Sequence, residues 1–324
     1  MSLLEADSKK KLVCVAPMMD WTDRHCRYFL RQVSSTARLY TEMITTGALI
    51  HGDVERHLAF DPAEHPVALQ LGGSEPGDLA ICARLGEQYG YDEINLNIGC
   101  PSERVQRGAF GACLMAEPAL VADCVSEIRR NVKIPVTVKH RTGIDSIEDY
   151  GFLKNFVEVV AAAGCETFIV HARNAVLKGL SPKENREIPP LKYDYVYRLK
   201  RDFPRLEIVI NGGITRAEDI QRQLLQVDGA MIGRAAYHNP WLLADAGKTR
   251  AQVVRAMKSY CESKRNVSLR GVARHMLGLY HGTPRARLWR RMLSDSAALT
   301  RNDPGLLLET LEAVEGPRSI MAAA

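Results

Sequence analysis

Polar residues and glycines that could do chemistry lie directly after short apolar runs of this 324-residue chain. Cys100 is the most distinctive of them, because it stands between Gly99 and Pro101 in a constrained turn just past the run that ends at Asn97. Thiols are mostly protonated at neutral pH, so this one could act as a proton donor. No base stands beside it in the sequence, which leaves a nucleophilic role open but unsupported. The alternative is a buried, inert thiol, which is what we expect of the other seven cysteines.

Two cationic or titratable residues, Lys139 and His171, end other apolar runs. A lysine at the end of a buried strand is not a typical solvated surface residue. A cation there would suit an anionic cofactor edge, such as the N1–C2=O region of a reduced flavin. His171 alone could be a core histidine, but its match in depth to Lys139 favours a cofactor contact. Gln70 could donate to and accept from the polar edge of a heterocycle.

Glycines follow the last two apolar runs, at Gly212-Gly213 and at Gly233, and Arg234 comes next. Glycine lets backbone amides approach a phosphate closely, and an arginine can add charge. The alternative for Gly212-Gly213 is a tight turn without a ligand.

Eight short, β-prone runs separated by amphipathic segments must position these residues. The runs cover residues 13–16, 39–42, 67–71, 93–97, 136–139, 167–171, 208–211 and 230–233, and helices are expected over 79–89, 118–131, 149–163, 193–202 and 217–226. Several runs are continuously apolar, as parallel strands buried on both faces should be. Eight such units predict a (β/α)₈ TIM barrel, whose active site lies at the carboxyl ends of the strands. The rival is an open doubly wound sheet, but no G-x-G-x-x-G follows the first strand.

The chain changes character in its last quarter, where strand-like runs stop and helices are expected over 253–263, 269–280, 286–300 and 304–314. Residues 246–324 hold fourteen Lys and Arg against six Asp and Glu, whereas the remainder holds 29 against 32. We therefore expect a barrel domain over 1–245 and a small basic helical domain over 246–324. Such a balance suits an enzyme that docks a polyanion, although a solvated basic surface would look the same.

Composition excludes several classes of protein. Hydrophobic residues make up 46% and charged residues 25%, which is typical of a globular protein and not of a disordered or fibrous one. No apolar run is long enough to span a membrane, and no secretory signal opens the chain, so we expect a cytoplasmic protein. No two of the eight cysteines form a C-x-x-C pair, so neither a disulfide framework nor a metal site is expected.

Longer motifs at the same strand ends resemble the flavin-dependent tRNA-dihydrouridine synthases. The run from Gly90 to Pro101 contains the N-x-G-C-P signature of that family. The other matching segments are 16–23, 40–43, 68–73, 138–141, 171–173, 211–214 and 231–234. Two further segments, 179–191 and 274–280, resemble the A-type branch, which acts at positions 20 and 20a of the tRNA D-loop. The likeness runs from about residue 12 to about residue 295.

The resemblance implies a TIM barrel with a C-terminal helical domain and one FMN over the barrel mouth. Pro17, Met18 and Met19 would line the isoalloxazine, with Gln70 and Lys139 at its polar edge and His171 close by. The ribityl phosphate would be held by Asn211, Gly212, Gly213, Gly233 and Arg234.

The resemblance also implies the reaction. NADPH reduces FMN, hydride passes from flavin N5 to C6 of an extruded uridine, and Cys100 protonates C5. Asn97 and Arg141 would contact the substrate. Candidate contacts to the rest of the tRNA, at the D-loop and elbow, are Lys183, Arg186, Arg287 and Arg290. We expect the protein to act as a monomer.

Two rival functions use the same observations. A free-pyrimidine flavin reductase or a dihydroorotate-type dehydrogenase would share the barrel, the FMN and an acid, but it needs no basic helical domain. An RNA-binding or chaperone protein could carry a catalytically silent barrel. The complete set of flavin and cysteine positions argues against that second rival.

Overall fold

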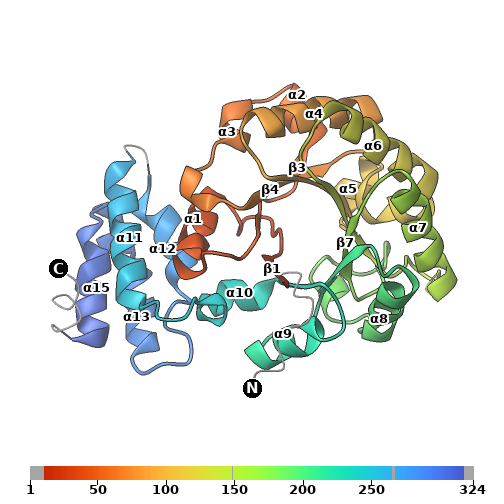
Figure 1. Ribbon diagram of the computed structural model, residues 1–324. Helices are drawn as coiled ribbons and strands as arrows, with labels where there is room; N and C mark the ends of the chain where they lie inside the picture. The colour runs from red at the N-terminus through yellow and green to blue at the C-terminus, as the bar shows by residue number, and fades with distance from the viewer. Residues whose placement is uncertain (1–10, 148, 265–266, 317–324) are drawn as a thin grey trace, which may run out of the picture. The chain divides into compact units, whose positions relative to one another are not determined.

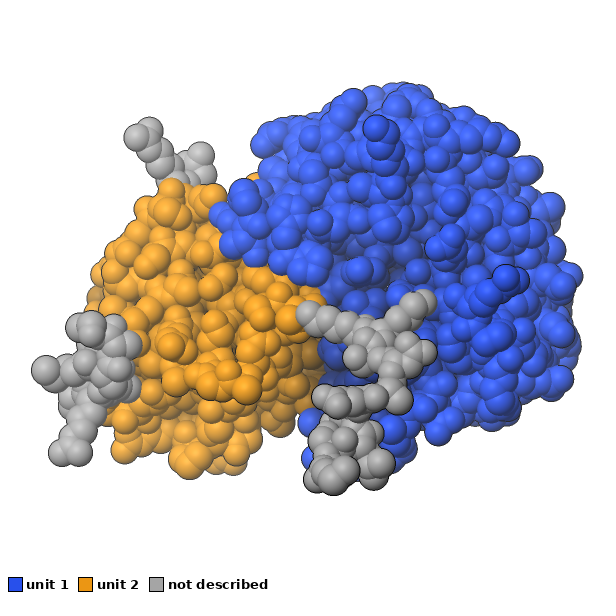
Figure 2. Space-filling model, viewed as in Figure 1, with its two compact units in different colours: residues 1–19, 38–233 blue, residues 20–37, 234–324 orange. Residues whose placement is uncertain are grey.

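The computed structural model describes residues 11–147, 149–264 and 267–316. Contacts between residues divide the chain into two compact units, which Figure 2 colours separately. Unit 1 comprises residues 1–19 and 38–233, and unit 2 comprises residues 20–37 and 234–324. Each unit has its own core and is described by itself.

Unit 1 is a barrel of parallel strands (Figure 1). Its strands are β1 (Leu12–Val15), β2 (Leu39–Tyr40), β3 (Ile44–Thr45), β4 (Val67–Gly72), β5 (Glu93–Ile98), β6 (Val136–Arg141), β7 (Thr167–His171), β8 (Glu207–Asn211) and β9 (Gly229–Ile232). The pairing order is β2-β4-β5-β6-β7-β8-β9-β1, with β3 on β4. The ring closes where Arg38 pairs with Cys14, because the Val15 amide donates to the Arg38 carbonyl at 2.9 Å. The predicted (β/α)₈ barrel is confirmed.

Helices cover the outside of the strand ring (Figure 1). The longer ones are α4 (Pro76–Gln88), α6 (Pro118–Asn131), α7 (Tyr150–Ala162), α8 (Tyr193–Asp202) and α9 (Ala217–Leu224). Short elements fill the connections: α2 (Thr46–Ile50), α3 (Val54–Leu58), α5 (Glu103–Arg107), η1 (Pro62–Glu64), η2 (Gly111–Ala116) and η3 (Glu184–Arg186). Local sequence fixes several starts: proline occupies the first position of α4 and α6, and the Asp149 side chain caps α7.

The barrel interior divides into an apolar part and a polar part. Alternate residues of a strand point inward, so the register between neighbouring strands determines which inward-facing side chains lie side by side. Seven buried residues form the apolar cluster: Cys14, Ala16, Tyr40, Ala68, Ile169, Val209 and Met231. On the side of β4, β5 and β6, the register places Gln70 beside Asn95, Asn95 beside Thr137, and Asn97 beside Lys139. A row of polar side chains therefore runs through the interior from one end of these strands to the other.

Unit 2 is helical. It contains α1 (Arg24–Val33), α10 (Arg234–His238), η4 (Pro240–Leu243), α11 (Arg250–Ser263), α12 (Leu269–Met276), α13 (Ala286–Leu293), α14 (Ser296–Thr300) and α15 (Gly305–Glu315). Trp289 is fully buried in its core, where the indole N–H donates to the Met276 carbonyl at 2.8 Å and the ring packs on Tyr280. No helix within the described residues is long and apolar enough to cross a membrane.

Three predicted elements were wrong in kind or extent, and most of the others differ from the structure by one to three residues at an end. The strand expected over 39–42 ends at Tyr40, and β3 follows it unpredicted. The helix expected over 269–280 ends at Met276, and the one over 286–300 is split by Asp295, whose side chain caps a second helix, α14. The contacts also group α1 and residues 234–245 with the C-terminal helices. The domain boundary between residues 245 and 246 stays a prediction.

Candidate active site

The turn that carries Cys100 follows β5 directly and is held from several sides. The Asn97 side-chain oxygen accepts the backbone N–H groups of Gly99 at 3.1 Å and Cys100 at 2.9 Å. The Cys100 carbonyl accepts the Ala112 amide at 2.9 Å. A Cβ at Gly111 would come within 2.6 Å of that carbonyl, so this close approach requires glycine. Six cysteines are buried, whereas the Cys100 and Cys113 side chains are only half-buried.

An amide cluster lies beneath this turn. Gln70 donates through Nε2 to Asn95 Oδ1 at 2.7 Å and accepts at Oε1 from Asn97 Nδ2 at 2.9 Å. Gln70 and Asn95 are buried, and Asn97 is half-buried at the barrel mouth. The predicted cofactor contact Gln70 is therefore hydrogen-bonded to the predicted substrate contact Asn97. Each keeps one amide N–H for a ligand.

Three basic side chains gather at the ends of β6 and β7. Burial, and after it the positive charge of Arg141, lowers the pKa of Lys139 to about 7. Burial also lowers the pKa of Arg141 to about 10. For His171, burial and the charges of Arg141 and Lys139 hold the pKa well below its usual range.

None of the groups that shift these three pKa values most is a carboxylate, and an ionised Cys100 would raise the pKa values of Lys139 and Arg141. Within the described part of the chain, the Lys139 ammonium makes no hydrogen bond or ion pair. A half-buried cation without an anion is unfavourable, so this arrangement fits a negatively charged group supplied from outside the chain.

Arg141 donates only to backbone carbonyls. Its Nε reaches the Gly99 carbonyl at 3.1 Å, and its Nη1 reaches those of Asn174 at 3.1 Å and Asn185 at 2.8 Å. It thereby ties the Cys100 turn to the loop that follows β7. This geometry supports a role in holding loops together, and the predicted substrate contact stays a prediction.

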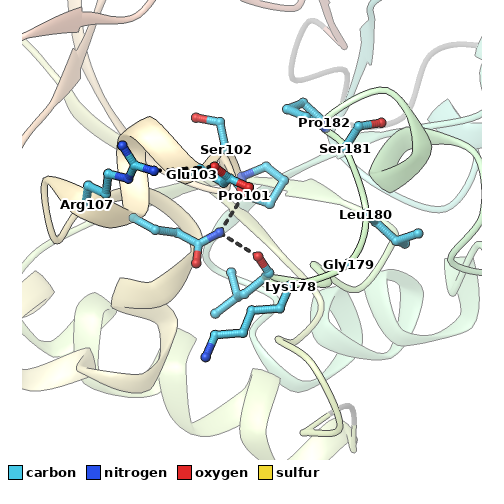
Figure 3. A pocket seen from close by; sticks show the side chains of 11 residues that line it. Pro101, Ser102, Glu103, Arg107, Lys178, Gly179, Leu180, Ser181 and Pro182 are labelled. Atoms are coloured by element: carbon cyan, nitrogen blue, oxygen red, sulfur yellow. Dashed lines mark hydrogen bonds and ion pairs between the residues drawn. The ribbon is translucent and has the colours of Figure 1, made fainter.

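A pocket of about 820 Å³ opens between these same two segments (Figure 3). It is lined by Pro101, Ser102, Glu103, Gln106, Arg107 and residues 177–182. Gln106 Nε2 donates to the carbonyls of Pro101 and Leu177, each at 2.7 Å. The predicted RNA contacts Lys183 and Arg186 follow this lining segment, and both are exposed.

The predicted phosphate residues differ in what holds them. Gly212 and Gly213 both have positive φ, and a Cβ on Gly212 would come within 2.7 Å of the His171 ring. The protein's own turn therefore already requires glycine there. A Cβ on Gly233 would meet nothing closer than 3.7 Å, so the chain's own packing does not require this glycine, whereas a closely bound ligand would. Asn211 uses its amide on the Met231 carbonyl at 2.8 Å.

The remaining predicted residues lie in other segments of the chain. Pro17 and Met18 are half-buried after β1, and Met19 is 55% exposed. Arg234 begins α10 directly after Gly233. In unit 2, Arg287 and Arg290 are exposed on α13, whose Trp289 and Leu293 are buried. No group of His, Cys, Asp or Glu within the described residues could hold a metal ion.

The structure thus brings together Gln70, Asn97, Cys100, Lys139, Arg141 and His171 at the carboxyl ends of β4 to β7. The sequence-based prediction missed Asn95 and Gln106. The signal for Asn95 was available, because Glu93, Asn95 and Asn97 alternate with apolar residues and must share the inner face of one strand. Gln106 carried no such signal, since its partners are backbone carbonyls of two loops.

Known proteins resemble this chain over nearly its full length. A family profile described as dihydrouridine synthase (Dus) matches residues 14–315. A Synechocystis protein named tRNA-dihydrouridine(20/20a) synthase is 55% identical, with 99% of this chain and all of the relative covered. Proteins of that name from Shewanella oneidensis and Escherichia coli K12 are 56% and 55% identical, and the matches cover 90% and 94% of this chain and 91% and 92% of the relatives.

A solved structure of a 2-naphthoyl-CoA reductase complex matches 71% of this chain and 49% of its own, with a TM-score of 0.56 at 10% identity. That likeness supports the barrel fold alone. The profile covers nearly the whole described chain, and the relatives are similar over nearly their full length. The chain therefore belongs to the dihydrouridine synthase family of enzymes.

Proposed function

We propose that this enzyme reduces the C5=C6 bond of uridine to 5,6-dihydrouridine at positions 20 and 20a of the tRNA D-loop, with FMN as its cofactor and NADPH as the reductant. The position is the one printed in the names of its relatives. The observation that carries the proposal is the half-buried thiol of Cys100 beside basic residues that have no carboxylate partner among the described residues.

The residues present fit FMN. Lys139 and the remaining N–H of Gln70 would hold the polar edge of its ring, and His171 would lie close by. Glycines 212, 213 and 233 and Arg234 would hold the phosphate, with Pro17, Met18 and Met19 along the ring. When bound and reduced by NADPH, FMN supplies the hydride that C6 of the uracil accepts.

The chain's own residues supply the proton and the positioning. Negative charge that develops at C5 and the C4 carbonyl is neutralised when the Cys100 thiol gives its proton to C5, and solvent then restores that proton. The free N–H of Asn97 is available to orient the pyrimidine edge. Extruding the base costs a few kcal/mol, and less in an irregular loop than in a helix.

The tRNA itself would be bound by exposed basic residues, namely Lys183 and Arg186 in unit 1 and Arg287 and Arg290 in unit 2. Phosphate contacts of this kind release counterions, so binding should weaken steeply as salt rises. A tRNA substrate implies the cytoplasm as the place of action. The monomeric state stays a prediction.

The test compares Cys100→Ala with the matched control Cys113→Ala, because these are the two half-buried cysteines. We expect the first variant to lose about 10²–10⁴-fold of the rate of dihydrouridine formation on tRNA, the usual share of general acid catalysis, and to keep its flavin absorbance. The control should stay within threefold of the wild type. A loss of less than threefold in Cys100→Ala would refute the role of this thiol.

Free uracil is the control substrate. The proposal predicts turnover on tRNA and none on the free base. Comparable turnover of both would instead favour a free-pyrimidine reductase.

A further inference from the structure

We infer that Glu93, Thr137 and Asn95 are positioning residues that fix the amide orientations of Gln70 and Asn97 and, through them, the backbone turn of Cys100. The inference deepens the proposed function, and it rests on that function only in taking Cys100 as the catalytic acid. None of the three residues reaches the barrel mouth itself, since Glu93, Asn95 and Thr137 are all buried.

The observation is an unbroken chain of hydrogen bonds through unit 1. The Cys100 amide donates to Asn97 Oδ1 at 2.9 Å, and Asn97 Nδ2 donates to Gln70 Oε1 at 2.9 Å. Gln70 Nε2 donates to Asn95 Oδ1 at 2.7 Å. Asn95 Nδ2 then donates to Thr137 Oγ1 at 2.8 Å, and that hydroxyl donates to Glu93 Oε1 at 2.6 Å.

Each end of this chain has a fixed polarity. A backbone N–H can only donate, and an ionised carboxylate can only accept. Burial raises the pKa of Glu93, but the Arg38 guanidinium at 2.6 Å opposes that shift. The hydroxyls of Tyr40, at 3.0 Å, and Thr137 also donate to this carboxyl group. Three donors directed at one carboxyl group favour its ionised form.

The fixed ends determine every amide between them. An isolated Asn or Gln amide can rotate by about 180°, so that its oxygen and its NH₂ group exchange positions. If Gln70 turned over here, its NH₂ would face that of Asn97. Asn97 would have to turn as well, and its NH₂ would then face the amides of Gly99 and Cys100 and break both bonds of the turn. The carboxylate at the start of β5 thus sets the geometry of the thiol turn at the other end of that strand.

The decisive comparison is Thr137→Val against Thr137→Ser. Valine keeps the shape but removes the hydroxyl that joins Glu93 to Asn95, whereas serine keeps it. The first measurement is the alkylation rate of Cys100 by iodoacetamide in the folded protein, followed by peptide mass spectrometry with Cys113 as internal reference. We expect at least a threefold change in the Cys100 rate for valine and less than twofold for serine.

The second measurement separates kcat from KM on tRNA. A misplaced acid should lower kcat at least tenfold in the valine variant and leave KM within twofold, while serine restores kcat. Cys100 alkylation that is equal in all three proteins would overturn the inference, as would a rise in KM at unchanged kcat. If the valine variant does not fold, Thr137→Cys replaces it, because a thiol is only a weak donor.

The positioning chain and the proposed activity are tested by separate measurements. Alkylation of Cys100 requires neither flavin nor tRNA, so it tests the positioning chain even if the wild type makes no dihydrouridine. Wild-type protein that is inactive on tRNA would refute the proposed function alone.

Discussion

Both units bring basic side chains together, and in unit 2 the chain itself places a carboxylate among them. In unit 2, Asp23 accepts from Arg274 Nη2 at 2.6 Å, His275 Nε2 at 3.1 Å and the Cys26 amide at 2.9 Å. Burial by itself would raise the pKa of Asp23, yet the bonds from His275, Cys26 and Arg274 hold it below its usual range. At the barrel mouth of unit 1, Lys139 has no carboxylate partner in the part of the chain that the structure describes.

The difference separates a structural cluster from a binding site. A set of cations that is completed within the chain stabilises the fold and needs nothing else. A set that is left incomplete destabilises the empty protein and becomes favourable only when an anion arrives. The following predictions would break or sharpen this contrast, and their expected effects become progressively smaller.

Removing the carboxylate of Asp23 from unit 2 should lower the free energy of unfolding more than any other substitution considered below. We expect Asp23→Ala to lower the free energy of unfolding by about 2 kcal/mol, because it removes the carboxylate partner of the fully buried His275 and of the exposed Arg274 and uncaps α1. Chemical denaturation measures this change. The control is Asp295→Ala, which removes an exposed cap of α14 and should cost about 1 kcal/mol. Equal losses in the two variants would mean that Asp23 is only a helix cap.

Removing a cation at the barrel mouth should weaken cofactor binding without lowering the free energy of unfolding of the protein that lacks FMN. We expect Lys139→Met to weaken FMN binding about tenfold, or about 1.4 kcal/mol, and not to destabilise the protein without FMN. Fluorescence titration of apoprotein with FMN gives the affinity. Lys133→Met, an exposed lysine shortly before the start of the same strand, should bind FMN as the wild type does. Unchanged affinity in Lys139→Met would remove this lysine from the cofactor site.

The same lysine predicts a pH dependence. Its pKa is about 7 in the folded protein and ~10.4 for an unperturbed lysine, so the unfolded chain binds more protons between these values. Stability without FMN should therefore rise with pH across this window, by less than the ~1.4 kcal/mol per pH unit that one full proton gives.

Urea unfolding of the wild type and Lys139→Met at pH 7, 8 and 9 isolates this contribution. The stability of the variant relative to the wild type should fall as the pH rises. Parallel curves would show that the Lys139 ammonium is not strained by burial. Bound FMN should flatten the wild-type slope, because an anion stabilises the charged lysine.

The smallest effect is expected from the exposed arginines of unit 2. Arg287→Ala with Arg290→Ala should weaken tRNA binding about threefold at moderate salt and make the affinity less sensitive to salt, since each phosphate contact adds to that dependence. Filter binding over a range of salt concentrations measures both quantities. Flavin reduction by NADPH should be normal, and an unaltered salt slope would place the RNA surface elsewhere.

Much of the barrel could be predicted because buried parallel strands leave continuous apolar runs. The strand Thr167–His171 and helices α6 and α8 have the predicted limits. Helix α1 was missed because it buries Arg27 and Arg31, which interrupt its apolar face. Their guanidinium groups are satisfied by backbone carbonyls, with Arg27 donating to Thr22 and Arg31 to Ser34 and Ala37. Those partners cannot be read from residue types.

Part of the candidate site could likewise be predicted from the sequence, and part could not. Barrel geometry alone places Gln70, Cys100, Lys139 and His171 near one rim, because each follows or ends a strand. The role of Arg141 could not be predicted, since its three partners are carbonyls of Gly99, Asn174 and Asn185. The amide chain likewise depends on the register of β4, β5 and β6.

Those carbonyls have a consequence for how this enzyme can diverge. A carbonyl group belongs to every residue type, so Arg141 and Gln106 constrain the route and length of the loop after β7 more than its composition. Side chains on the outer surface of that loop can be substituted to suit a different RNA without disturbing Cys100. A deletion of one residue there would remove a carbonyl partner of Arg141 or Gln106 and loosen the cysteine turn. Substitutions in this loop can therefore change the RNA target, whereas a change in its length would impair catalysis.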